Sequence, residues 1–201
     1  MKKIMVTLLA LAVFAVNGYS QGAVSSVFGE SASGTRSATA IVKPGKEPGI
    51  VTDLTWEVDS GVQTASVDIR LGEKRYAVAS ATSGSGTVLW FTNSGTAVAA
   101  DEFVIFHDVS VGTYTLHRVQ SATATSVTVY ETVSVATTTS DFVFSLLDVM
   151  RRPARPVTTS GTTGPAAVDI HIPADLPSAF IVDGNTTSCR VNVNGVRSAH
   201  K

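Results

Sequence analysis

Hydrophobic and polar residues alternate along most of this sequence with the two-residue period of β-strands. Between Thr87 and Val135, four runs rich in β-branched and aromatic residues are separated by Gly, Ser, Asn, Asp or Ala. Apolar runs broken by turn-forming residues indicate consecutive short antiparallel strands. We therefore expect this stretch to form the centre of a β domain.

The same alternation continues toward the N-terminus. Two further runs place apolar residues at every second position: Leu54, Trp56 and Val58, then Val67, Ile69 and Leu71. About eight strands fit between residues 40 and 149, at the spacing typical of β-sandwiches and small barrels. We predict an all-β fold, an antiparallel β-sandwich or small barrel, for residues 40–149.

The C-terminal part of the chain divides into two segments. Residues 150–165 begin with Arg and Pro and continue with Gly, Ser and Thr, a composition typical of a linker. Residues 166–201 return to strand-like alternation, and Asp183-Gly184-Asn185 predicts a hairpin turn. Because 36 residues are too few to fold alone, this short C-terminal β-hairpin appendage must dock on the main domain or on another molecule.

The N-terminal segment has the pattern of a secretory signal peptide. Residues 1–20 contain two lysines, an apolar run and the small residues Gly18 and Ser20, which predicts cleavage after Ser20. The apolar run is shorter than the ~20 residues that span a bilayer, which disfavours a retained anchor. We expect a secreted, periplasmic or cell-surface protein without a transmembrane segment in the mature chain.

Residues 21–39 are small and polar, with no strong period. They predict a flexible N-terminal arm, or alternatively an extended arm that pairs with a neighbouring subunit.

Composition narrows the function classes. The formal net charge is −1, which argues against nucleic acid as a partner. Only 15% of residues are charged, below the ~25% of a typical soluble domain. Hydrophobic residues make up 44% of the chain, enough to form a core.

Residues that carry chemistry are few. Cys189, the only cysteine, is interpreted as a buried free thiol or as half of a disulfide between two chains. His107 and His117 lie on successive predicted strands, and with Asp101 and Asp108 they could form a metal or acid–base cluster. The alternative is that they are ordinary polar residues at strand ends.

No residue spacing is typical of a zinc site, a serine nucleophile or a phosphate-binding loop. We assign no catalytic residue, no metal and no cofactor.

Aromatic side chains offer a second kind of site, because they stack on sugars. Trp56 shares its face with apolar residues and is expected in the core, and Trp90 lies in a continuous apolar run that predicts burial. Tyr114 and Tyr130 are the better candidates for a ligand-binding surface.

These observations favour an exported, non-enzymatic structural or interaction protein, a subunit of a cell-surface or extracellular assembly. Protein partners or self-assembly would involve the N-terminal arm and residues 166–201. The alternative is a secreted carbohydrate-binding β-sandwich module that binds polysaccharide. A third hypothesis, a secreted hydrolase, requires a pocket that holds His107 or His171 together with carboxylates.

Overall fold

The computed structural model describes residues 24–58, 66–91, 98–153, 161–166 and 170–198. The expected signal peptide lies outside these residues. All elements of the described residues are β-strands, and no helix among them is long and apolar enough to cross a membrane. The predicted all-β, antiparallel fold is confirmed.

Eleven strands are present in the described part of the chain: β1 (Val24–Val42), β2 (Gly49–Val58), β3 (Ser66–Ala77), β4 (Gly86–Trp90), β5 (Phe103–Asp108), β6 (Thr113–Ala122), β7 (Ser126–Val133), β8 (Phe142–Pro153), β9 (Gly161–Ala166), β10 (Ile170–Ile172) and β11 (Ser178–Ser198). Hydrogen bonding links them in the order β10-β2-β11-β3-β8-β5-β6-β7-β4, with β1 added to β11 and β9 to β2.

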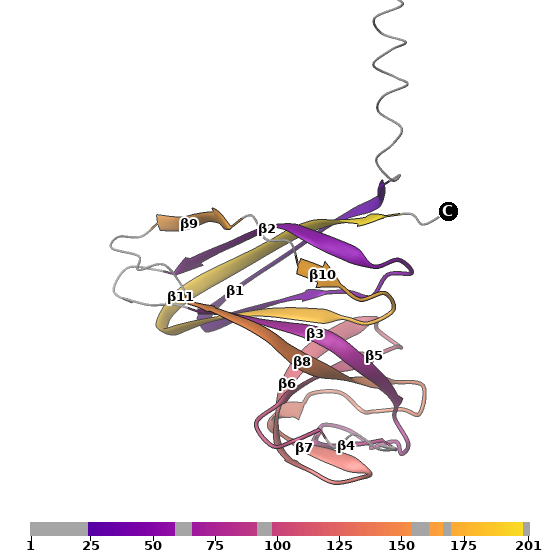
Figure 1. Ribbon diagram of the computed structural model, residues 1–201. Helices are drawn as coiled ribbons and strands as arrows, with labels where there is room; N and C mark the ends of the chain where they lie inside the picture. Colours follow the sequence, from indigo (N-terminus) through magenta and orange to yellow (C-terminus); the bar gives the residue numbers. More distant parts are fainter. Residues whose placement is uncertain (1–23, 59–65, 92–97, 154–160, 167–169, 199–201) are drawn as a thin grey trace, which may run out of the picture.

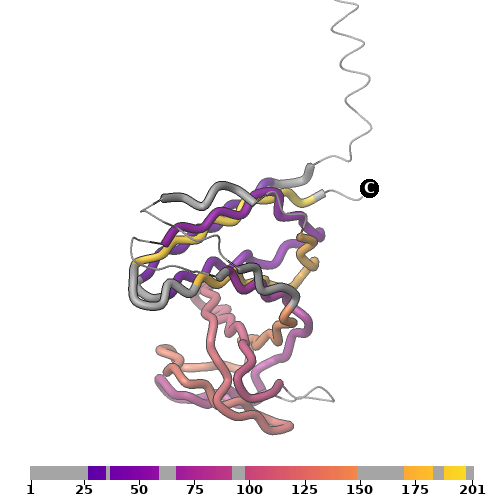
Figure 2. The backbone as a smooth tube through the Cα atoms, turned by 60° about the vertical axis from the view of Figure 1, so that its left-hand side comes forward, coloured from indigo at the N-terminus to yellow at the C-terminus, as the bar shows by residue number. Residues whose placement is uncertain are grey.

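The two longest strands, β1 and β11, run through both layers of a sandwich (Figures 1 and 2). The first part of β1 pairs with the end of β11, from Val24 with Ser198 to Thr35 with Ser188. After a shift in register, Ser37 pairs with Asp183 and the ladder continues to Val42. The late part of β11 also pairs with β2, and its early part pairs with β3. A bend in both strands therefore joins the two layers.

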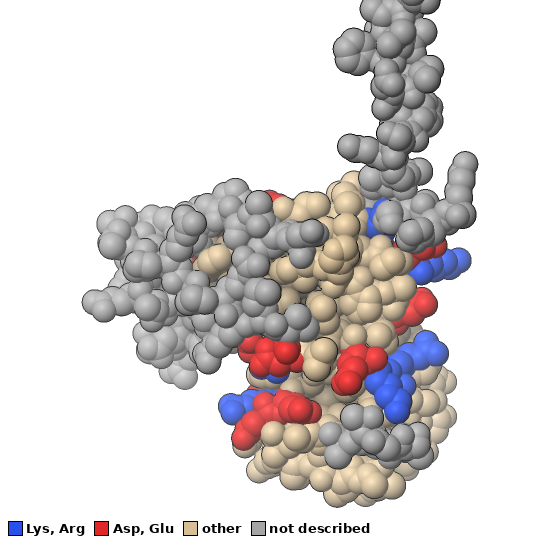
Figure 3. Space-filling view, in the orientation of Figure 1, with Lys and Arg blue, Asp and Glu red and all other residues tan. Residues whose placement is uncertain are grey.

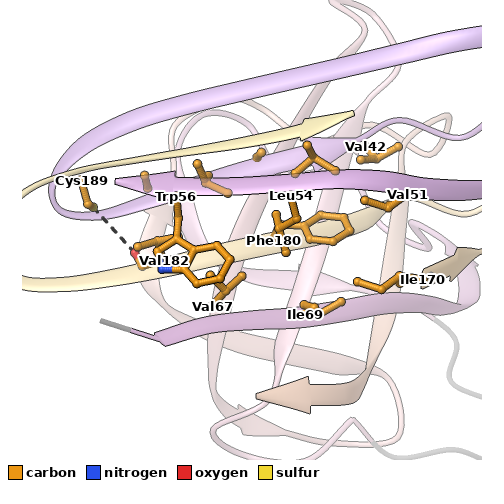
Figure 4. Close-up of a cluster of buried hydrophobic side chains, with 14 of the residues drawn as sticks. Val42, Val51, Leu54, Trp56, Val67, Ile69, Ile170, Phe180, Val182 and Cys189 are labelled. Carbon is orange, nitrogen blue, oxygen red and sulfur yellow. Dashed lines mark hydrogen bonds between the residues drawn. The ribbon is translucent and has the colours of Figure 1, made fainter. Parts of the chain in front are cut away.

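The core of this upper sandwich contains alternating side chains from β1, β2, β3, β10 and β11 (Figure 4). Leu54 and Val67 are fully buried, and Trp56 is 5% exposed. The inward faces predicted from the period of two are therefore correct for these strands. Cys189 is also in this core, where its Sγ lies 3.8 Å from the carbonyl oxygen of Val182.

A second core fills the lower lobe, where β4 to β8 curl around one another (Figure 1). Its members include Tyr76 from the end of β3, Phe91, Phe106 from β5 and Val143 from β8. Because β3 contributes Val67 to the upper core and Tyr76 to the lower one, the two cores share a continuous strand.

The turn between β5 and β6 spans residues 109–112. The Asp108 carboxylate accepts hydrogen bonds from the Ser110 hydroxyl at 2.6 Å and from the Ser110 amide at 2.9 Å. These bonds lower the pKa of Asp108, with the Ser110 hydroxyl as the largest cause. Gly112 has a φ of 72°, which glycine adopts without strain.

The structure differs from the expectation for both flanking segments. Most of the expected N-terminal arm belongs to β1, which pairs with β11 in the same chain. Residues 178–198 form one strand between β2 and β3, so they are an integral part of the sheet. The expected linker is also shorter: β8 continues to Pro153, and β9 begins at Gly161.

The predicted turn at Asp183-Gly184-Asn185 is an irregularity within β11, and two glycines mark similar irregularities within strands. Register shifts occur at Gly72, between Asp183 and Ser188, and at Gly195, yet β3 and β11 continue through them. A Cβ atom on Gly195 would overlap the Phe28 ring and the carbonyl oxygen of Ile50. Glycine is thus required here for close packing, which gives the same sequence signal as a turn.

Candidate functional site

An open groove of about 800 Å³ lies between β1 and the β5-β6-β7 part of the sheet. Its lining comes from β1, β5, β6, β7 and β11 and from the residue after β7: Ser37, Thr39, Ile41, Phe103, Tyr114, Thr115, Leu116, His117, Arg118, Glu131, Thr132, Ser134 and Ile181. We refer to it as the β1 groove.

The floor of the β1 groove is apolar. Ile41, Phe103, Tyr114, Leu116 and Ile181 are partly buried and pack against a third buried cluster, formed by Ile105, Phe144, Leu146 and Ala179. These side chains are held from below by close packing, so the floor is preformed and still offers apolar area to a ligand.

Tyr114, one of the two predicted ligand-binding residues, lies in this floor. Its ring stacks on the imidazole of His107, with centroids 4.0 Å apart and planes 6° apart. Burial raises the pKa of Tyr114, so its hydroxyl is neutral at physiological pH. One ring face is occupied by His107, which leaves the rest of the half-buried side chain available to the groove.

The polar wall of the β1 groove is centred on Arg118. Its guanidinium lies 3.0 Å from the Asp101 carboxylate and 5.5 Å from the ring centroid of Tyr130. The Arg118 amide donates to Glu131 Oε2 at 3.3 Å. Tyr130, the second predicted residue, is 52% exposed and lies next to the groove without lining it.

His117 is the most buried polar residue of this wall, with 7% of its surface exposed. Burial lowers its pKa, and the charge of Glu131 offsets part of that effect. Its Nε2 lies 2.8 Å from the Thr115 hydroxyl, and its Nδ1 has no hydrogen-bond partner. The imidazole is therefore neutral near pH 7.

The structure does not form the histidine–aspartate cluster that the sequence suggested. His107 pairs with Tyr114 across the strands, and His117 pairs with Val104. Because side chains alternate between faces, an odd spacing of three residues places the two histidines on opposite faces of the sheet. Asp108 caps its own turn, and Asp101 binds Arg118. The alternative interpretation, ordinary strand-end polar residues on the solvent face, fits Asp101 but not the buried Asp108 and His117.

The two histidines of the hydrolase hypothesis lie outside the β1 groove. His107 stacks against Tyr114 and Phe142, while His171 is exposed on β10, and neither lines the β1 groove. No group of three or more His, Cys, Asp or Glu among the described residues could hold a metal ion.

The exposed fractions of Cys189 and Trp90 bear on two further predictions. Cys189 is 4% exposed, which supports the buried-thiol interpretation. The expected burial of Trp90 is wrong, because 41% of its surface is exposed. Its neighbours Leu89 and Phe91 both face the lower core, so this apolar run is buried on one face.

Sequence analysis missed most of the β1 groove. Tyr114, Leu116 and Arg118 are alternate residues of β6, so the period of two places them on one face. Their opposition to Ile41 and Ile181 depends on the fold bringing β1 and β11 alongside, and no local pattern encodes that contact.

Comparisons with protein-family models and with curated proteins identified no relative of this chain. No protein-family model matches the chain, and no curated protein matches it closely enough to be a relative.

Proposed function

We propose that this chain is an exported, non-catalytic interaction protein, a subunit of a cell-surface or extracellular assembly. In this proposal the β1 groove receives an extended segment of a partner polypeptide. The observation that carries it is the open edge of β1 beside the groove. Within the described residues, β1 pairs with β11 alone, so its other edge presents backbone donors and acceptors.

The edge segment from Ser37 to Val42 lacks two of the usual protections against strand addition. It contains no proline and no charged residue. Ala38, Ala40 and Val42 are buried in the upper core, while Ser37, Thr39 and Ile41 line the groove. An added strand could bond to this backbone and place alternate side chains on the apolar floor.

Pairing of β1 and β11 within one chain changes the expected route to assembly. Residues 21–39 and 166–201 are the segments through which the sequence predicts contact with a neighbour, and residues 166–201 were also expected to dock on the main domain. Most of both segments belongs to β1, β10 and β11 of the same sheet. The proposed contact is therefore the free edge of β1, with no exchange of either segment required.

The test is the molar mass of the mature chain, residues 21–201, by size-exclusion chromatography with light scattering over a concentration series. We expect wild type to associate and Thr39→Lys to weaken association at least about tenfold. A lysine beside the incoming backbone would have its charge desolvated at a cost above ~1.4 kcal/mol.

The matched control is Thr139→Lys, which places the same charge on an exposed turn residue. A wild-type chain that stays monomeric at high concentration contradicts self-assembly, as does equal weakening by both lysine variants.

A second candidate is carbohydrate binding, favoured by two exposed aromatic residues of the lower lobe. Trp90 on β4 is 41% exposed and Tyr130 on β7 is 52% exposed. Leu89 and Val129 face the lower core, so the alternation directs Trp90 and Tyr130 to the outer face of the β4-β7 pair. Retardation of the protein in gels that contain polysaccharide, lost in Trp90→Ala and Tyr130→Ala, would support this candidate.

A further inference from the structure

A smaller and more enclosed hollow lies between β3, β8 and the loop that precedes β5. Its volume is about 300 Å³, at the lower end of small-molecule sites. Three carboxylates line it, from Glu73, Glu102 and Asp148. We refer to it as the acidic pocket. In Figure 3, acidic side chains with basic ones among them lie across the middle of the face that contains β3 and β8.

Arg70 neutralises only one side of this pocket. Its guanidinium lies 2.9 Å from the Asp68 carboxylate and 3.2 Å from Asp148, and over the Phe103 ring at 5.2 Å. Within the described residues, Glu73 and Glu102 have no ion-pair partner. These two carboxylates therefore leave a net negative potential at the pocket.

Both unpaired carboxylates are partly held in place by neutral donors. Glu102 Oε2 accepts the Ala99 amide at 2.8 Å, and Glu73 Oε2 lies 3.4 Å from the Ser145 hydroxyl. Within the described residues, the second oxygen of each carboxylate has no hydrogen-bond donor, so it can accept a bond from a ligand.

An independent sign of a missing partner comes from Tyr76. This residue lines the pocket and is 4% exposed, but its hydroxyl has no hydrogen-bond partner. Buried hydroxyls in folded proteins are nearly always bonded, so such a group requires an explanation. Its ring already attracts a cation, because Lys74 Nζ lies 5.3 Å from the ring centroid.

We propose that the acidic pocket binds a primary ammonium group on a short aliphatic chain. The ammonium would donate to Glu73, to Glu102 and to the Tyr76 hydroxyl, three acceptors for its three hydrogens. Val98 and Leu147, which also line the pocket, would contact the methylene groups.

An organic cation fits this pocket better than a metal ion. No three described carboxylates, histidines or cysteines are placed to share one metal. Dispersed carboxylates and apolar walls suit a ligand with a charged head and an apolar stem, which a free alkylamine and a lysine side chain share.

The test uses two-dimensional ¹H–¹⁵N spectra of the mature chain at low salt, titrated with n-pentylamine and separately with Nα-acetyl-lysine methylamide. 1-Pentanol serves as the uncharged control. We expect saturable shifts around the pocket with an amine and none with the alcohol. Glu102→Gln and Tyr76→Phe should each weaken binding about fivefold or more.

Glu57→Gln, which removes a carboxylate from β2, should leave the affinity unchanged. Binding of pentylamine alone would identify a free amine as the ligand, and equal binding of the lysine derivative would identify a protein side chain. Absence of saturable shifts with both amines overturns the proposal, as does an affinity that Glu102→Gln leaves unaltered.

Discussion

At the residue scale, one buried arginine connects three parts of the upper sandwich. Arg197 is 7% exposed and donates to the carbonyl oxygens of Glu47 at 2.6 Å and Lys43 at 2.8 Å. Its guanidinium also lies 5.4 Å from the ring centroid of Phe28. It thereby holds the β1–β2 connection against both β11 and β1.

Replacing Arg197 by methionine should lower the free energy of unfolding by about 2–3 kcal/mol, because two carbonyl groups lose charged donors. Urea unfolding followed by circular dichroism measures this loss. Arg190→Met is the matched control, since the Arg190 side chain is 57% exposed and 3.9 Å from Glu57. Its effect should stay below ~1 kcal/mol; equal losses would deny Arg197 its special role.

The second prediction at this scale concerns acid. Burial lowers the pKa of His117 and of His107. The two imidazoles therefore bind a proton more readily in the unfolded chain than in the folded one. The contribution of the neutral histidines to the free energy of unfolding is therefore fully present above the unfolded pKa of about 6.5, and it is lost as pH falls below that value. The free energy of unfolding, measured between pH 8 and 5, should decline less steeply in His117→Gln. An unchanged slope in His117→Gln would contradict this prediction.

At the element scale, periodicity predicted faces well and connections poorly. Leu54, Trp56, Cys189 and their neighbours face the core as the period of two requires, because alternation is a local property of a strand. The predicted burial of Trp90 is wrong because a run of apolar residues does not show whether one or both faces of a strand are buried.

The candidate site shows the same division between local and distant information. Tyr114 could be identified as a candidate from the sequence, but the β1 groove depends on β1 lying alongside β5 and β6, which are more than 60 residues away. Asn194-Gly195 has the composition of a turn but lies within β11, since a bulge and a turn both favour glycine.

The bulge at Gly195 allows a prediction with a matched control. Gly195→Ala should lower the free energy of unfolding by about 1–3 kcal/mol, because the added methyl would overlap Phe28 and the Ile50 carbonyl. Gly86→Ala meets no atom within 4 Å and should change stability far less. Thermal unfolding of the two variants, side by side with wild type, decides the matter; similar losses would refute the steric argument.

At the scale of the whole molecule, the two cores should unfold together. β3 supplies Val67 to the upper core and Tyr76 to the lower one, and β8 pairs with β3 along its whole length. A break between the lobes would interrupt this long ladder, so cooperative unfolding is expected.

Two tryptophans report on the two lobes separately. Trp56 is buried in the upper core, and Trp90 is in β4 of the lower lobe. In Trp56→Phe and Trp90→Phe the remaining tryptophan follows one lobe, and we expect its fluorescence curve to coincide with circular dichroism of the same variant. Distinct midpoints for the two probes within one variant would show that the lobes unfold independently.

The long ladder between β1 and β11 also has a mechanical consequence. Val24 pairs with Ser198, so these two ends of the ladder lie side by side. A force that pulls Val24 and Ser198 apart acts on one residue pair at a time, so the hydrogen bonds of the ladder break one after another from that end. Tension applied along both strands in opposite senses would instead load every pair at once. The direction in which the protein is tethered therefore determines how much force its upper sandwich resists.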